Sequence, residues 1–164
     1  MTMQSGKTSG KRWVSILLWL LVLAIPEVMQ AAGPYQFFSV TPCRIVDTRG
    51  PAGVTGGPAL TSGVARNFPV GVAPAACGIP STAKAVSLNV TFVGPTKPGY
   101  LTLWPYNTAQ PLVSTVNANA GEPAIANGAI VPLTTDPSFN ISVYYGTNQA
   151  GSTNVVIDTN GYFQ

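Results

Sequence analysis

From Tyr35 onward, apolar residues recur at every second position of the chain, and this alternation limits the possible folds more than any other feature. The longest run is "KAVSLNVTFV" at 84–93, in which valine, leucine and phenylalanine alternate with serine, asparagine and threonine. Residues two apart share one face of a β-strand, whereas a helix face requires spacings of three and four. The pattern therefore predicts strands that bury one face in a core and expose the other.

Further segments with strand character follow one another along the chain. They are 35–40, 43–47, 65–70, 99–104, 112–117, 128–133, 139–145 and 154–163. The stretches between them, such as "GPAGVTGGP" at 50–58 and "GTNQAGS" at 146–152, are rich in residues that favour turns. About nine short strands predict an all-β fold, an antiparallel β-sandwich, with a closed β-barrel as the alternative.

The first 32 residues have the layout of a secretory signal peptide. Three basic residues precede an apolar run at 13–25, and small residues at 31–33 follow a polar break. The run of about 13 residues is shorter than the ~20 that a membrane-spanning helix needs, and a retained anchor is the alternative. We therefore expect residues 1–32 to direct secretion to the extracellular space or cell surface, and residues 33–164 to form one β-sandwich domain.

Charge and residue content exclude several classes of function. Beyond residue 32 the chain has five basic and four acidic residues, without the basic stripe that nucleic-acid binding requires. The absence of histidine removes Ser–His–Asp and Cys–His catalysis, and two cysteines are too few for a zinc site. A glycosidase using Asp47 and Asp158 is the remaining catalytic alternative. "DTNG" at 158–161 contains part of a calcium-loop pattern but predicts a tight turn. We expect no catalytic residue, no metal and no cofactor.

The segment "TPCRIVDTRG" at 41–50 concentrates charge and a cysteine in a chain that is only 8% charged. Cys43 and Cys77 are the two cysteines, and in an exported chain they predict a disulfide that stabilises the fold by roughly 3–4 kcal/mol. Asp47 and Arg49 alternate and so share one strand face, with Arg44 on the face opposite Asp47. We expect Asp47 and Arg49 to form a structural ion pair that fixes the glycine-rich loop after them, because an unpaired buried charge is costly.

Polar and aromatic residues on the strands suggest two further kinds of site. Asn89 and Asn140 begin N-x-S/T sequons and are expected on an outward strand face, where they matter in a host that glycosylates such sites. Tyr100, Trp104 and Tyr106 gather around one strand, and exposed aromatic rings at such positions bind sugars. Packing in the core or between subunits is the alternative role of these three rings.

The motifs "FFSVTPCRIVDTR", "CGIPSTAKAVSLNVT", "GYLTLWP", "STVNANAGEPAIANGAIVPL" and "VVIDTNGYF" together resemble a family of secreted bacterial β-sandwich modules. The likeness covers nearly the whole chain after the expected signal peptide. Modules of this family occur alone, in tandem, or attached to cell-wall amidases and other surface proteins, and have no established catalytic role. The resemblance implies that the Cys43–Cys77 pair and the Asp47/Arg49 motif belong to the fold, and it assigns no ligand.

These features favour a non-enzymatic structural subunit that assembles with copies of itself into an extracellular fibre or surface layer. A surface with so few charges suits a protein that is immobilised, glycosylated or assembled better than a free monomer. The candidate inter-subunit strand carries Tyr35, Phe37, Phe38 and Val40, and we expect it to exchange between subunits by pairing with a neighbouring sheet. The alternative function is a module that binds cell-wall polysaccharide or another carbohydrate.

Overall fold

The computed structural model describes residues 1–2, 34–71 and 77–164. The chain divides into two units, Met1–Gly33 and Pro34–Gln164, and every described strand belongs to the second unit. Apart from Met1 and Thr2, the expected signal peptide lies outside the described residues. Within the described part of the chain, no helix has the length and apolar character needed to cross a membrane.

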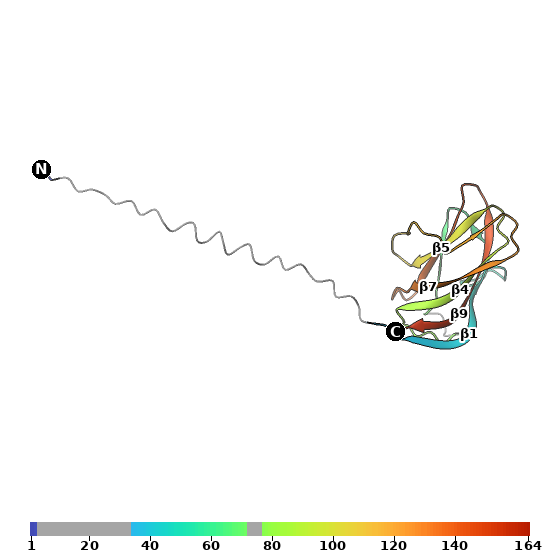
Figure 1. The fold of residues 1–164 in the computed structure, drawn as a ribbon, viewed down its shortest axis with the longest axis horizontal. Coiled ribbons are helices and arrows are strands. Elements are labelled where there is room, and N and C mark those ends of the chain that lie inside the picture. The colour runs from blue at the N-terminus through green and yellow to red at the C-terminus, as the bar shows by residue number, and fades with distance from the viewer. Residues whose placement is uncertain (3–33, 72–76) are drawn as a thin grey trace. The chain divides into compact units, whose positions relative to one another are not determined.

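The second unit is an all-β, antiparallel sandwich, as the alternation predicts (Figure 1). Its strands are β1 (Phe37–Asp47), β2 (Leu60–Thr61), β3 (Ala65–Phe68), β4 (Ala85–Val93), β5 (Gly99–Pro105), β6 (Val116–Ala118), β7 (Ile125–Pro132), β8 (Ile141–Gly146) and β9 (Ser152–Phe163). One sheet has the order β1-β9-β4-β7, with β2 also paired to β9, and the other has the order β3-β8-β5-β6. Over the described residues neither sheet closes into a barrel, so the barrel alternative is wrong.

The core lies between the two sheets and is built by the alternating residues of their central strands. On β4 the four apolar residues at even positions, 86 to 92, are at most 3% exposed. They face Ile141, Val143 and Tyr145 of β8, which are fully buried. Each such side chain contributes ~1.5–3 kcal/mol by leaving water. Tyr145 is accommodated because its hydroxyl donates to the carbonyl of Lys97 at 2.7 Å.

Strand boundaries differ from the expected ones wherever the partner strand sets the length. The expected strands at 35–40 and 43–47 form one strand, β1, because both halves pair with β9 across an irregularity between Ser39 and Cys43. β7 begins earlier than expected because it follows β4 from Phe92 to Ala85. The two-residue strand β2 was not predicted, since such a short segment has no measurable alternation.

Candidate functional site

Four charged side chains form a continuous network on the outer side of β1 and β9. The Arg44 Nε donates to Asp158 Oδ1 at 2.8 Å, and its Nη1 donates to Asp47 Oδ2 at 3.2 Å. Arg49 holds the same Asp47 through Nε at 2.8 Å and Nη2 at 2.6 Å. The side-chain hydrogen bonds from Arg49 are the main cause that lowers the pKa of Asp47 to about 2. The hydrogen bond to Asp158 raises the pKa of Arg44 in turn.

The expectation that Arg44 faces away from Asp47 is wrong, because β1 contains a bulge. Arg44 lies opposite Asp158 and Val46 lies opposite Ile157, so Ile45 is an extra residue in the ladder. One inserted residue shifts the alternation by one step and brings Arg44 to the face of Asp47. The network leaves both acids paired with arginine. The lowered pKa of Asp47 does not suit the general-acid role that a glycosidase requires of one carboxyl group.

The glycine-rich loop at 50–58 is held mainly by Arg66 of β3, which the sequence did not indicate. The Arg66 Nη1 donates to the Pro58 carbonyl at 2.5 Å, and its Nη2 lies 2.6–3.1 Å from the carbonyls of Gly53, Gly56 and Gly57. The guanidinium carbon also lies 4.8 Å above the ring of Phe68 on the same strand. Asp47 contacts this loop through its main chain, whose N–H donates to the Thr55 carbonyl at 2.9 Å. The Asp47–Arg49 pair is therefore not the principal anchor of the loop.

The predicted disulfide between Cys43 and Cys77 is confirmed, with Cα atoms 5.5 Å apart. Cys43 lies beside Arg44 on β1, so the covalent bond and the ionic network secure the same stretch of strand. This stretch is the second half of β1, from Cys43 to Asp47.

The aromatic residues proposed for sugar binding do not form an exposed platform. Trp104 is only 7% exposed, and its Nε1 donates to the Thr108 carbonyl at 3.1 Å. The turn after β5 covers the outer face at this point, so the expectation that Trp104 is exposed is wrong. Tyr106 is half-buried against Phe139, with ring centroids 5.5 Å apart. Tyr100 alone of the three is exposed, at 36%.

The two sequons have different environments. Asn89 is exposed on β4, as expected. Asn140 is 3% exposed, and its expected outward position is wrong. Its Oδ1 accepts from the N–H groups of Val70 and Gly71 at 2.8 and 2.9 Å, and its Nδ2 donates to the Thr134 carbonyl at 3.0 Å. Asn140 therefore joins three segments from inside and is inaccessible to a modifying enzyme.

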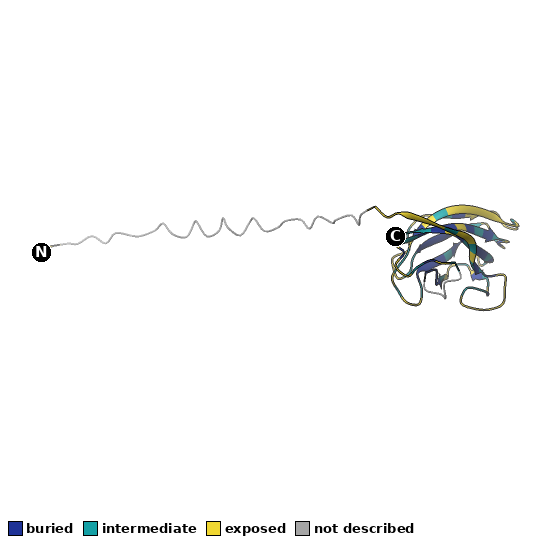
Figure 2. Ribbon diagram, turned by 90° about the horizontal axis from the view of Figure 1, so that it is seen from below, coloured by how far each residue is buried: buried dark blue, intermediate teal, exposed yellow. Residues whose placement is uncertain are grey.

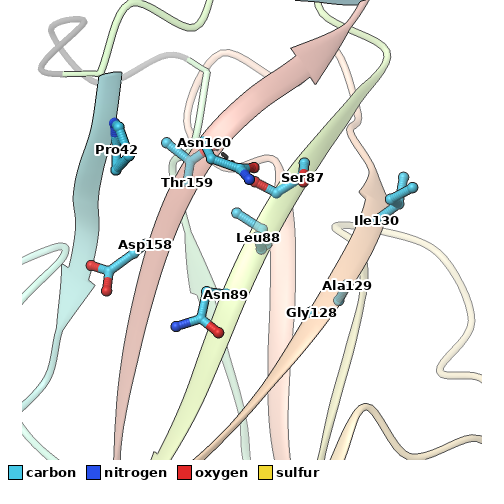
Figure 3. Close-up of a pocket in the computed structure, with 10 residues that line it drawn as sticks. All are labelled: Pro42, Ser87, Leu88, Asn89, Gly128, Ala129, Ile130, Asp158, Thr159 and Asn160. Carbon is cyan, nitrogen blue, oxygen red and sulfur yellow. Dashed lines mark hydrogen bonds between the residues drawn. The ribbon is translucent and has the colours of Figure 1, made fainter. Parts of the chain in front are cut away.

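A shallow groove of about 820 Å³ crosses the outer face of the sheet that contains β1, β9, β4 and β7. Its lining residues are Pro42, Ser87, Leu88, Asn89, Gly128, Ala129, Ile130, Asp158, Thr159 and Asn160. Figure 3 shows Pro42 on β1 and Ile130 on β7 at its two sides, with the polar residues of β9 and β4 between them. The polar positions of β4 follow from its alternation, whereas Asn160 enters the groove because it is inserted opposite the step from Ser87 to Leu88.

The first half of β1 has little side-chain burial. Phe37 and Phe38, together with Tyr35 just before the strand, are 42–49% exposed, and Val40 is half-buried. In Figure 2 the start of the domain is coloured yellow, as exposed residues are. Its contacts with the end of β9 are aromatic: Phe37 lies 5.2 Å from Phe163, and Phe38 lies 5.4 Å from Tyr162, between ring centroids. Thus one strand has an anchored half and a weakly packed half.

Comparisons with known proteins give no relative for this chain: no protein family, no curated protein and no solved structure matches it. The resemblance to secreted bacterial modules stays a prediction from the quoted motifs.

Proposed function

We propose that this chain is a secreted, non-enzymatic structural subunit that assembles with copies of itself into an extracellular fibre or surface layer. The observation that carries the proposal is the first half of β1. This half places Phe37 and Phe38 on the outermost strand of a sheet, and Tyr35 lies just before the strand begins; all three residues are more than 40% exposed. Exposed apolar residues on an edge strand are the features that allow strands of separate molecules to pair.

The start of this edge, before the irregularity between Ser39 and Cys43, lacks the devices that commonly prevent such pairing. The stretch "PYQFFSVTPC" at 34–43 contains no charged residue, and its prolines lie near its two ends. Soluble proteins protect edge strands with lysine, with inward charges or with proline in the middle of the strand. The open stretch between Pro34 and Pro42 therefore supports self-association.

The anchoring of the second half of β1 is consistent with the same proposal. The disulfide at Cys43 and the Arg44–Asp158 ion pair hold the strand where the first half ends. A neighbouring copy can then engage the first half without disturbing the core. The engagement takes place either by the expected strand exchange or by addition of a strand to the free edge, and residues 34–41 form the contact in both cases.

The proposal is tested by removing or charging this segment. Deletion of residues 34–41 should give a folded protein that remains monomeric in sedimentation velocity, with no filaments in negative-stain electron microscopy. Phe37→Lys should have the same effect because it puts a charge on the edge. Leu112→Lys is the matched control, since Leu112 is fully exposed on a loop. Assembly by the deletion variant at the level of the unmodified chain would refute the proposal.

Binding of cell-wall polysaccharide is the second candidate function, and the groove favours it. The side chains of Ser87, Asn89 and Asn160 line the groove and make no hydrogen bond to any described residue. Free hydroxyl and amide groups on a concave surface match the hydroxyl groups of a neutral sugar chain. The double variant Asn89→Ala/Asn160→Ala should lose retention on insoluble cell walls, whereas Tyr100→Ala tests the exposed ring away from the groove. Equal retention of the double variant and the unmodified chain would count against this function.

A further inference from the structure

The two edge strands of the larger sheet, β1 and β7, expose a larger share of their residues than the strands between them. In β7 only Val131 is buried, and in β1 only Val46 is buried. The central strands β4 and β9 bury at least four residues each. Neither the stretch at 34–43 nor β7 contains a charged residue, so no like charges oppose contact between them.

On its free side, β1 has main-chain N–H and C=O groups that are available for hydrogen bonding. Gln36 N–H donates to the Gln164 carbonyl at 2.9 Å, and Gln164 N–H donates to the Gln36 carbonyl at 3.0 Å. In an antiparallel ladder, residues bonded in this way alternate with residues whose main-chain groups point away from the partner. Tyr35, Phe37 and Ser39 therefore direct their N–H and C=O groups away from β9.

The same alternation applies to β7. The Leu133 N–H donates to the Lys84 carbonyl at 2.8 Å, which orients Leu133 and every second residue before it toward β4. Gly128, Ile130 and Pro132 then lie with their main-chain groups on the free side. The position of Pro132 agrees with this assignment, because proline lacks an N–H and is tolerated where no partner strand requires one.

Sheet topology makes the two edges complementary. The ladders β1–β9, β9–β4 and β4–β7 are all antiparallel, so β1 and β7 run in opposite directions. A second copy displaced along the sheet without reversal would place its β1 antiparallel to the β7 of the first copy. Each junction between copies would then be an antiparallel strand pair, as are the ladders of this sheet within the subunit. A contact between two β1 edges would instead be two-fold symmetric and would stop at a dimer.

We infer that the free edge of β1 in one copy pairs with the free edge of β7 in the next, giving a continuous sheet that grows by addition. This inference rests on the proposed self-assembly and assigns its acceptor surface. The beginning of β7 is near β6, where the Asn127 Nδ2 donates to the Thr115 carbonyl at 2.8 Å. The pairing therefore uses residues 128–132 of β7 and residues 35–39, which comprise the start of β1 and the two residues before it. Addition breaks no bond within either copy, whereas exchange requires β1 to leave β9.

Two proline substitutions test the inference in the full chain. Ser39→Pro removes an outward N–H from β1, and Ile130→Pro removes one from β7, while the bonds to β9 and β4 remain. Each variant alone should sediment as a monomer. Their equimolar mixture should form dimers and nothing larger, because it contains one intact edge of each kind. Ser39→Ala and Ile130→Ala keep both donors and should assemble like the unmodified chain.

The outcomes separate this inference from the proposed function. Assembly of Ile130→Pro at the unmodified level, with Ser39→Pro monomeric, would overturn the β7 assignment and leave self-assembly intact. Monomers throughout, including the unmodified chain, would overturn both. If a proline variant fails to fold, hydrogen exchange on the unmodified protein decides the matter. The amides of Phe37, Ser39 and Ile130 should become protected on assembly, and an unprotected Ile130 amide would refute the pairing.

Discussion

Arg66→Ala should destabilise the domain more than any other single substitution of a charged residue. The guanidinium lies within hydrogen-bond distance of four carbonyl oxygens of the loop at 50–58 and contacts the ring of Phe68. These carbonyls come from a segment with few apolar residues, and no side chain of the loop can replace the cation. Burial lowers the pKa of Arg66, but an arginine remains charged at any physiological pH.

The expected magnitude follows from which carbonyls can regain water. Hydrogen bonds to a charged group contribute ~1.5–3 kcal/mol each, but an exposed carbonyl recovers most of that from solvent. Gly53 and Pro58 are exposed and Gly56 is partly exposed, so Gly57 is the one buried residue of the four. A buried carbonyl left without a hydrogen-bond partner costs about 1–3 kcal/mol. Loss of the cation–π contact adds about 0.5–1 kcal/mol. We expect a total loss of about 1.5–4 kcal/mol.

Urea unfolding followed by intrinsic fluorescence measures this loss. Arg49→Ala is the matched control, because Arg49 forms a solvent-exposed pair with Asp47 and its loss should change stability much less than Arg66→Ala. Arg66→Lys should fall between the two, since an ammonium group has three donors and cannot reproduce the planar geometry of the guanidinium. Equal midpoints for Arg66→Ala and Arg49→Ala would refute the claim that Arg66 is the anchor of the loop.

Three further substitutions test other parts of the structure. Replacing Cys43 and Cys77 together by serine should lower the free energy of unfolding by about 3–4 kcal/mol, measured by urea unfolding under non-reducing conditions. Because the pKa of Asp47 is lowered from 3.8 to about 2, its contribution is complete above about pH 4 and is lost as pH falls toward 2. Solvent screening keeps this contribution near ~1 kcal/mol, and Asp47→Asn should remove that portion of the acid dependence in thermal melts. Asn140→Ala should cost about 2–4 kcal/mol because it leaves the buried N–H groups of Val70 and Gly71 without an acceptor. Asn89→Ala, its exposed counterpart, should change stability by less than about 0.5 kcal/mol.

The alternation of apolar residues was enough to predict the sandwich and the inward face of β4, because side-chain burial follows the strand period directly. It failed where a local irregularity changes that period. Nothing in "CRIVD" marks Ile45 as the bulged residue, so the face of Arg44 could not be assigned. The environment of Trp104 depends on a turn that folds back over the strand, and alternation does not describe the cover on an outer face.

The role of Arg66 was hidden for a different reason. Its partners are main-chain carbonyls, which every residue possesses, so no residue type in the loop signals the contact. The ion pairs of Asp47 and Asp158 with arginine, by contrast, join side chains of opposite charge, and such residues are visible in the sequence. Asn140 resembles Arg66 in this respect, since two of its partners are the N–H groups of Val70 and Gly71.

The two halves of β1 allow a test of whether strand exchange is open to this protein at all. The amides of Gln36 and Thr48 both donate to the neighbouring β9 region, to the carbonyls of Gln164 at 2.9 Å and Val155 at 3.1 Å. The bonds are alike, but Gln36 is exposed whereas Thr48 is 3% exposed and adjoins the anchored half. Local opening depends on packing as well as on the hydrogen bond, so Gln36 should exchange its amide hydrogen at least about tenfold faster than Thr48 in the monomer. Such a difference means that the first half of β1 can leave β9 while the second half stays in place, as exchange requires. Equal protection at both amides would mean that β1 opens only with the whole domain, and addition to the free edge would then be the remaining route to assembly.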